Sequence, residues 1–350
     1  MSAARLTIDL DALARNHAAL AAAAPGAEIA PVVKSDGYGL GAAIVGRRLW
    51  AEGARSFFVA RLAEGQDLRR ALGDRAARIY VLDGVGPDDA GPLAEADLTP
   101  VINSLACAWR WRPTGRPAAL HVDTGMNRLG LAAADVERVR DLPIAHVMSH
   151  LACAAAPDDA LNGQQRERFA AVRALFPDAR ASLAASAGIF LGEAYWFDAV
   201  RPGICLYGGG PRERPDPRFA AVARLEAPIL QLRDLKAGDF VSYGRAFVAD
   251  RPMRIALVAA GYTDGFIRGA ARGKASVCVG GVAARVLTVS MDMLAVDVSD
   301  ATCAREGDPV ELLGQNAPLD DLAAAAGTVA HECLVRLSSR AERVYVGAVD

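Results

Sequence analysis

The sequence is poor in cysteine and histidine, and the few it has form no metal-binding motif. Its six cysteines are scattered without a CxxC pair, and its five histidines form no HExxH motif. Scattered cysteines are typical of reduced thiols in a cytosolic protein and not of a disulfide framework. The same scarcity argues against a structural or catalytic zinc ion, so we expect no metal site.

The chain also lacks an excess of either charge and lacks long hydrophobic runs. It has 39 basic and 41 acidic residues, a formal net charge of -2, which gives no basic surplus to neutralise a nucleic-acid backbone. The first residues, "MSAARLTIDLDAL", place acids where a secretory signal has an apolar core. Apolar runs elsewhere are interrupted well before membrane length. We therefore expect a cytoplasmic protein that binds neither nucleic acid nor membrane.

Short apolar runs alternate with helical patterns from residue 29 to about residue 206. Runs without polar alternation are typical of parallel strands that are covered on both faces. Eight such units over roughly 200 residues predict a (β/α)8 barrel, an α/β fold. The predicted strands cover residues 29–34, 56–61, 78–83, 98–103, 118–124, 144–150, 179–186 and 198–205.

The pattern changes after "GGGPRERPDPRF", a stretch at 208–219 that is dense in glycine, proline and charge. Strand-like runs joined by tight turns follow it, with one late helix at 319–327. We therefore predict a barrel domain over 10–219 and a mostly β domain over 220–350. We expect an N-terminal strand at 4–9 to be part of the β domain.

Five polar residues lie at or just past the predicted strand ends, where barrel enzymes place their catalytic groups. They are Lys34, Arg128, His150, Ser186 and Arg201. A set this basic favours an anionic ligand such as a phosphate with a carboxylate. A lysine amine there can bond covalently to a carbonyl or to pyridoxal phosphate.

Each of these residues also has an ordinary structural interpretation. Lys34 alone suits a solvated charge, His150 a buried histidine with a hydrogen bond, and Arg201 an ion pair. Ser186 suits a helix N-cap. The stretch after Lys34, residues 37–42, also satisfies a loose GxGxxA motif, so a dinucleotide-binding loop and an oxidoreductase are an outside alternative.

A series of motifs along the whole chain resembles the alanine racemase family. In order they are "VVKSDGYGLG", "HVDTGMNRLG", "MSHLAC", "VRPGICLYG", "AAGYTDGF", "SMDM" and "RVYVG". The resemblance implies a (β/α)8 barrel that binds pyridoxal 5'-phosphate, a following β domain, and a head-to-tail homodimer with shared active sites. It also implies interconversion of L- and D-alanine, which supplies D-alanine for bacterial cell-wall peptidoglycan.

The same resemblance assigns roles to the catalytic residues. Lys34 would hold the cofactor covalently and act as one acid/base, and Tyr262 of the partner subunit would act on the opposite face of the substrate. A chain from Tyr262 through His150 to Arg201 would tune the phenol. Arg201 would face the pyridine nitrogen, where a guanidinium keeps its proton and so suppresses transamination and decarboxylation.

Binding roles also follow from the resemblance. The cofactor phosphate would be held by Tyr38, Ser186, Tyr345 and the N–H groups of Gly203 and Ile204. The substrate carboxylate would meet Arg128 and the main chain at Met291, with Asp292 positioning that segment.

The sequence departs from the family pattern at three positions. His121 stands where the family often has a lysine, so Arg128 must be held in another way. Ala185 replaces an asparagine before the phosphate-binding serine. Ala275 lies where a tyrosine usually lines the substrate entrance, which widens that entrance and favours lower selectivity.

Two further functions therefore stand beside alanine racemisation. One is a racemase for a larger amino acid such as serine or lysine. The other is a non-catalytic protein of pyridoxal-phosphate homeostasis, which the second domain and Tyr262 disfavour.

Overall fold

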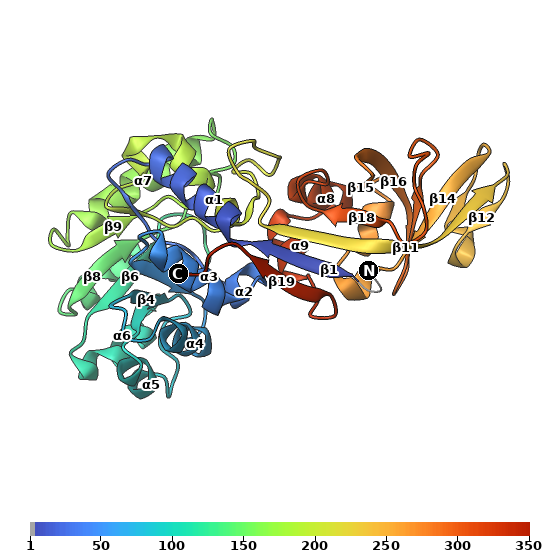
Figure 1. The fold of residues 1–350 in the computed structure, drawn as a ribbon. Helices are drawn as coiled ribbons and strands as arrows, with labels where there is room; N and C mark the ends of the chain where they lie inside the picture. Colours follow the sequence, from blue (N-terminus) through green and yellow to red (C-terminus); the bar gives the residue numbers. More distant parts are fainter. Residues whose placement is uncertain (1–3) are drawn as a thin grey trace. The chain divides into compact units, whose positions relative to one another are not determined.

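The protein, described here by a computed structural model over residues 4–350, folds into two compact units (Figure 1). The barrel unit comprises residues 14–206 and 349–350, and the β unit comprises residues 4–13 and 207–348. The predicted fold, a parallel α/β barrel and a mostly β domain, is confirmed.

Parallel strands form the wall of the barrel unit. Six strands pair in sequence order, β7 pairs with β6, and β2 pairs with β10. Single bridges between Val32 and Phe58 and between Ala185 and Arg201 connect these sheets into a ring. The strands are β2 (Glu28–Ile29), β3 (Ser56–Val59), β4 (Arg78–Val81), β5 (Thr99–Ile102), β6 (Ala118–Asp123), β7 (Leu131–Ala132), β8 (Ile144–Met148), β9 (Arg180–Ser182) and β10 (Ala199–Val200).

Helices follow most of these strands, as the alternating pattern predicted. Before the predicted strands at 98–103 and 198–205 the chain forms only a helix of 6 residues and short 3-10 turns. The helices are α1 (Leu10–Ala23), α2 (Lys34–Tyr38), α3 (Ala42–Ala51), α4 (Leu62–Leu72), α5 (Ala90–Glu95), α6 (Leu105–Trp111) and α7 (Ala160–Arg173), with 3-10 turns at Arg112–Thr114, Ala133–Val139, Ala187–Leu191, Glu193–Tyr195 and Ile204–Tyr207.

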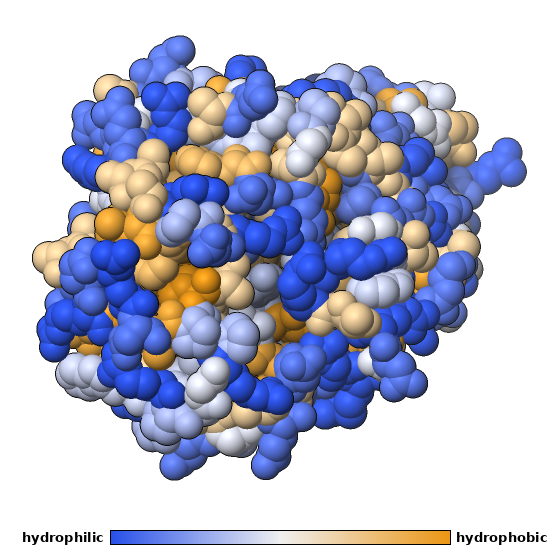
Figure 2. Space-filling view, turned by 90° about the vertical axis from the view of Figure 1, so that its left-hand side faces the viewer, coloured by the Kyte–Doolittle hydropathy of each residue, from blue (hydrophilic) through white to orange (hydrophobic). Residues whose placement is uncertain are grey.

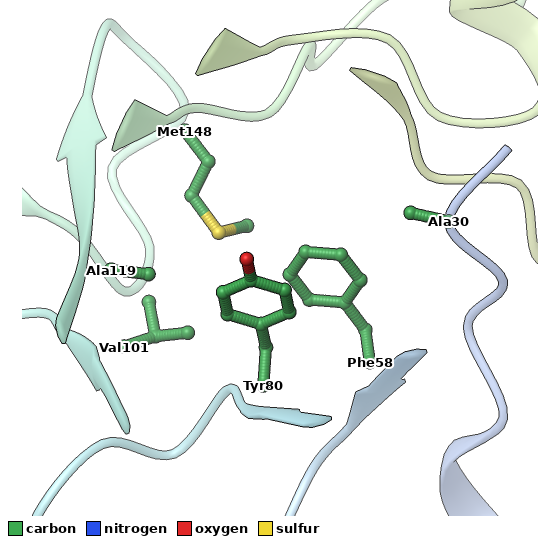
Figure 3. Close-up of a cluster of buried hydrophobic side chains, with 6 residues drawn as sticks. All are labelled: Ala30, Phe58, Tyr80, Val101, Ala119 and Met148. Carbon is green, nitrogen blue, oxygen red and sulfur yellow. The ribbon is translucent and has the colours of Figure 1, made fainter. Parts of the chain in front are cut away.

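Apolar side chains from successive strands fill the interior of the barrel unit (Figure 3). The Phe58 and Tyr80 rings stack with their centroids 4.6 Å apart at an interplanar angle of 14°. Such layers make the interior of a barrel a packed core, so polar groups that act on a ligand must project from the strand ends. The cluster consists of Ala30, Phe58, Tyr80, Val101, Ala119 and Met148.

The β unit is built on an eight-stranded sheet that closes on itself, because β11 pairs with β14 as well as with β18 and β1. Strand β1 also pairs in parallel with β19. The strands are β1 (Arg5–Asp9), β11 (Ala223–Leu235), β14 (Met253–Val258), β15 (Ser276–Val279), β16 (Val282–Val289), β17 (Leu294–Asp297), β18 (Pro309–Leu313) and β19 (Glu342–Val346), with a hairpin of β12 (Phe240–Val241) and β13 (Phe247–Val248), helices α8 (Leu319–Ala326) and α9 (Ala330–Val335), and 3-10 turns at Tyr243–Arg245, Tyr262–Asp264 and Arg268–Ala271.

Local sequence explains most of the β unit. Gly280 and Gly281 join β15 to β16 with φ of 56° and 84°, the positive values that a two-residue hairpin turn requires. The late helix predicted at 319–327 is α8. Strand β18 has a weak signal in the sequence, because its run is short and begins with Pro309, which usually marks an edge or a loop.

The visible surface is mostly hydrophilic, with hydrophobic residues in patches between hydrophilic ones (Figure 2). Over residues 4–350, none of the helices combines the length and the apolar character needed to cross a membrane.

Candidate active site

Lys34 begins a turn whose backbone is left-handed. Ser35, Asp36, Gly37 and Tyr38 have φ of 54°, 54°, 62° and 56°, so the segment drawn as α2 is not an ordinary right-handed helix. A left-handed conformation costs about 1–2 kcal/mol for each residue other than glycine. Such strain persists only where the surrounding structure imposes it, and it concentrates at functional sites.

Two carboxylates hold this turn in place. Glu64 on α4 accepts hydrogen bonds from the N–H of Ser35 (2.8 Å) and of Ala60 (2.7 Å), which ties the turn to the end of β3. Asp36 accepts a bond from the N–H of Ala42 (2.8 Å), at the first residue of α3. Glu64 was not predicted as a site residue, although a glutamate at the third position of a helix is a capping signal.

The Lys34 amine is partly buried and titrates below the usual range for lysine. Burial and the nearby charge of Arg128 lower its pKa, against the opposing effects of Glu64 and Asp83. A lowered pKa increases the fraction of neutral amine near pH 7, which is the form that attacks carbonyl groups and accepts protons. Lys34 therefore has the chemistry of a nucleophile or a general base.

Arg128 offers an unoccupied guanidinium near this amine. Asp123, at the end of β6, shapes the preceding loop by accepting bonds from the N–H of Gly125 and of Met126, both at 2.9 Å. The Arg128 side chain is exposed and makes no hydrogen bond or ion pair within residues 4–350. A free guanidinium suits a carboxylate ligand.

His121 is held in one tautomer by Asn103, a residue that the sequence analysis did not single out. The Asn103 amide nitrogen donates to the carbonyls of Leu82 (2.7 Å) and Val101 (3.0 Å), so its oxygen faces Nδ1 of His121 at 3.1 Å. Nδ1 therefore carries the proton, and Nε2 is an acceptor. Burial and the charges of Arg201 and Arg128 lower the pKa of His121 to about 4, so the ring is neutral at pH 7.

His150 lies at the end of β8 in a cationic surrounding. Burial, Arg201 and Arg128 hold the pKa of its imidazole well below the usual value. Gln165 of α7 anchors the segment by donating to the carbonyl of His150 (2.9 Å). The His150 ring makes no hydrogen bond with Arg201 or with any other residue from 4 to 350.

Ser186 receives two backbone N–H groups beyond β10. Gly203 donates to its hydroxyl oxygen at 3.0 Å and Cys205 at 3.3 Å, whereas the N–H of Ile204 makes no hydrogen bond among the described residues. The Tyr38 hydroxyl lies against Gly203, since a Cβ there would come within 2.1 Å of it. Burial raises the pKa of Tyr38, which keeps the phenol protonated as a donor. Hydroxyl and N–H groups that converge in this way suit a phosphate group.

Replacing Gly203 with alanine is expected to weaken cofactor binding by about tenfold or more, because the added methyl collides with the Tyr38 hydroxyl and overpacking costs about 1–3 kcal/mol. Spectroscopic titration with pyridoxal phosphate measures the affinity. The single variant Tyr38→Phe measures the loss of the hydroxyl donor alone. In the Tyr38→Phe background, adding Gly203→Ala should weaken binding much less than it does in the unmodified protein, because the colliding oxygen is gone. An equal loss in both backgrounds would show that the hydroxyl does not lie over this glycine.

In the β unit, Tyr262 and Met291 lie on adjacent loops. The N–H of Tyr262 donates to the carbonyl of Ser290 (3.1 Å), and Thr263 donates to the carbonyl of Met291 through its N–H (3.1 Å) and its hydroxyl (2.7 Å). Position 261 must be glycine, because a Cβ there would lie 2.2 Å from the Met291 carbonyl oxygen. The Met291 N–H makes no hydrogen bond among the described residues, so it remains available to a ligand.

Arg340 joins these two loops. Its guanidinium bonds to the Thr263 hydroxyl and to the Asp292 carboxylate, and it lies 3.6 Å from Asp264. The hydrogen bond from Arg340 lowers the pKa of Asp292. Arg340 was not predicted, because its role depends on residues distant in the sequence.

The predicted site residues are therefore divided between the two units. The barrel unit contains Lys34, Tyr38, Arg128, His150, Ser186, Arg201, Gly203 and Ile204, and the β unit contains Tyr262, Met291 and Tyr345. Tyr345 is half-buried on β19 opposite Ile8. Ala275 is 3% exposed within the β unit.

The barrel unit carries the features that pyridoxal phosphate needs. Lys34 supplies an amine of lowered pKa, and the groups around Ser186 supply converging donors for a phosphate. Arg201 supplies a buried guanidinium whose Nε–H makes no hydrogen bond among residues 4–350. These groups fit a ligand that combines an aldehyde, a phosphate and a ring nitrogen.

Comparisons with known proteins agree over the whole length of the chain. Family models described as the N-terminal and C-terminal domains of alanine racemase match residues 8–211 and 222–345. An alanine racemase of Methylobacterium nodulans is 44% identical over 98% of this chain and 96% of its own. A biosynthetic alanine racemase of Agrobacterium fabrum is 42% identical over 99% and 94%. The crystal structure of alanine racemase from Bartonella henselae with covalently bound pyridoxal phosphate is 33% identical, with a TM-score of 0.92 and coverage of 99% and 100%.

Proposed function

Since the chain belongs to the alanine racemase family, we propose that it interconverts L- and D-alanine with pyridoxal phosphate by a two-base mechanism. The observation that carries this proposal is the Lys34 amine, whose pKa is lowered by burial and by the unpaired guanidinium of Arg128. An amine of lowered pKa and a carboxylate-binding cation at one end of a barrel suit a reaction at the Cα of an amino acid.

The cofactor, when bound, withdraws electrons from the amino acid that is linked to it and so makes the Cα–H acidic. Lys34 holds the cofactor and takes or returns a proton on one face of Cα. The Tyr262 hydroxyl does the same on the opposite face, so that removal on one side and delivery on the other invert the centre. Arg128 and the free N–H of Met291 bind the carboxylate and fix which bond faces each base.

The remaining residues hold the cofactor and restrict its chemistry. Tyr38, Ser186, Gly203, Ile204 and Tyr345 would bind the phosphate. Arg201 would donate to the pyridine nitrogen through its Nε–H and would keep its proton, since burial lowers its pKa only to about 9. The family resemblance would place His150, kept neutral by its surroundings, between Tyr262 and Arg201, although its ring makes no hydrogen bond with Arg201 among the described residues.

We also infer that the protein acts in the cytoplasm as a homodimer in which Tyr262 and Met291 serve the partner's barrel. The family resemblance supports this arrangement.

Arg201→Glu is expected to raise keto-acid formation per racemisation event by about tenfold or more, because a carboxylate can keep a proton on the pyridine nitrogen. The measurement is pyruvate against inverted alanine at equal turnover. Arg201→Lys, which retains a cation, serves as the control and should stay closer to the unmodified protein. A variant that loses racemisation without a gain in pyruvate would place Arg201 away from the ring nitrogen.

The function itself is tested by incubating the holoenzyme with each L-amino acid in D2O and following Cα–H exchange and chirality. Exchange with inversion should be much faster for alanine than for serine or lysine. Faster turnover of serine or lysine would reassign the substrate, and no exchange with any amino acid would refute the proposal.

A further inference from the structure

The Arg201 guanidinium is enclosed by acceptors inside the barrel unit. Nη1 donates to the carbonyl of Ser182 (2.8 Å) and to its hydroxyl, and Nη2 donates to the carbonyl of Ser149 and, at 3.4 Å, to that of Leu183. The Arg201 Cζ also lies 5.9 Å from the centroid of the Phe58 ring. These contacts fix the plane of the guanidinium and therefore the direction of its unused Nε–H.

The Ser182 hydroxyl can take only one arrangement of its hydrogen. A guanidinium donates and cannot accept, so Ser182 Oγ accepts from Arg201. The Ser182 O–H therefore needs a different acceptor, and Nε2 of His146 lies 2.7 Å away. It follows that Nε2 of His146 carries no proton and that Nδ1 does.

Burial in the core keeps the His146 imidazole neutral, so its Nε2 can accept a hydrogen bond. The residue is 2% exposed, and its Nδ1 has no hydrogen-bond partner among residues 4–350. Burial and the charge of Arg201 lower its pKa to about 3, so the ring stays uncharged. Its ring packs against Tyr80, with centroids 5.3 Å apart, and edge-on to Phe58 at 6.1 Å. The Nε2 contact with Ser182 is the ring's one hydrogen bond among residues 4–350, and it offsets the cost of a buried Nδ1–H without a partner.

We propose that His146 and Ser182 are positioning residues that set the direction of Arg201. The Ser182 hydroxyl accepts a hydrogen bond from the Arg201 guanidinium and donates one to Nε2 of His146. Together the two bonds fix the orientation of the guanidinium. The consequence for catalysis rests on the proposed function, in which the Nε–H of Arg201 meets the pyridine nitrogen. The hydrogen-bond order itself does not depend on that function.

Two variants of His146 distinguish the loss of its hydrogen-bond acceptor from the loss of its aromatic ring. His146→Phe keeps an aromatic ring against Tyr80 and Phe58 but removes the acceptor, whereas His146→Gln removes the ring but retains an oxygen that can accept from Ser182. Ser182→Ala removes the hydroxyl and leaves the backbone carbonyl in place. His146→Phe and Ser182→Ala should raise pyruvate formed per racemisation event by about tenfold, the size expected for one charge-assisted hydrogen bond, and His146→Gln should stay within about threefold of the unmodified protein. This ratio does not change with the fraction of folded enzyme, so a merely structural role would leave it constant.

The second readout is independent of activity. In holoenzyme labelled with 15N-histidine, the resonances lost in His146→Phe identify His146, and they should report the neutral Nδ1–H tautomer between about pH 6 and pH 9. Ser182→Ala should shift the Nε2 resonance. An Nε2–H tautomer, or no response to Ser182→Ala, would overturn the proposal whether or not the protein is a racemase. A correct tautomer with an unchanged product ratio in His146→Phe would also overturn it, because Arg201 would then keep its direction without the acceptor.

Discussion

Replacement of Lys34 with alanine is expected to lower racemisation by about 10³-fold or more and to abolish the visible absorption of the bound cofactor. The change removes the covalent attachment point and one of the two bases together, and a single acid/base group is typically worth about 10²–10⁴ in rate. The measurements are alanine inversion and the absorption spectrum of the purified variant. A small primary amine added to the buffer should restore part of the activity, because it replaces the lost base.

The chain makes this prediction easy to check, since it contains only three lysines, at positions 34, 236 and 274. Borohydride reduction of the holoenzyme followed by peptide mapping should place the cofactor on Lys34 alone. Lys236 and Lys274 are exposed in the β unit, so Lys236→Ala and Lys274→Ala serve as matched controls and should keep full activity. Recovery of the label on either of them would contradict the assignment.

Tyr262→Phe is expected to lower racemisation by about 10³-fold, with a different signature from the lysine variant. Phenylalanine keeps the ring but cannot exchange a proton, so only the face of Cα served by Lys34 remains active. The variant should still bind the cofactor and should exchange the Cα hydrogen of one enantiomer with D2O without inverting it. NMR of each enantiomer separately measures this. Equal loss of exchange for both enantiomers would show that Tyr262 is not a base on one face.

Co-expression of Lys34→Ala with Tyr262→Phe tests whether the two bases come from different subunits. With random pairing about half of the dimers are mixed, and each mixed dimer has one site with both groups, so roughly a quarter of the unmodified activity should return. If both bases came from one chain, every site would lack one of them. Mixed dimers without recovered activity would therefore refute the shared site.

The barrel could be predicted from the sequence because its strands are short apolar runs of a kind that only a doubly covered parallel sheet buries. The run at 56–61 contains β3, for example, and all four residues of β3 are buried. The turn after Lys34 could not be predicted, because the left-handed backbone of Ser35 and Asp36 contradicts their intrinsic preference and is imposed by Glu64.

The candidate site was predicted where a residue's position at a strand end suffices, as for Lys34, Arg128 and Arg201. Asn103 and His146 were missed because each acts through a second side chain whose identity depends on the folded structure. Asn103 does end a predicted strand, so the same rule could have found it. His146 and His150 are four residues apart, a spacing that is informative on a helix, but here the first lies on β8 and the second just beyond it.

The closure of the barrel has a consequence for how the protein folds. The ring closes where Glu28 pairs with Ala199, two residues 171 positions apart (199 − 28), and the strands that meet there are two residues long. Contacts this distant in the chain form late, because the entropy of closing a long loop is lost before they contribute any stability. Lys34 follows one of these strands and Arg201 the other, so a partly folded barrel does not bring the two together. Pyridoxal phosphate therefore selects chains that have completed the ring, and its binding energy adds to the stability of the closed barrel.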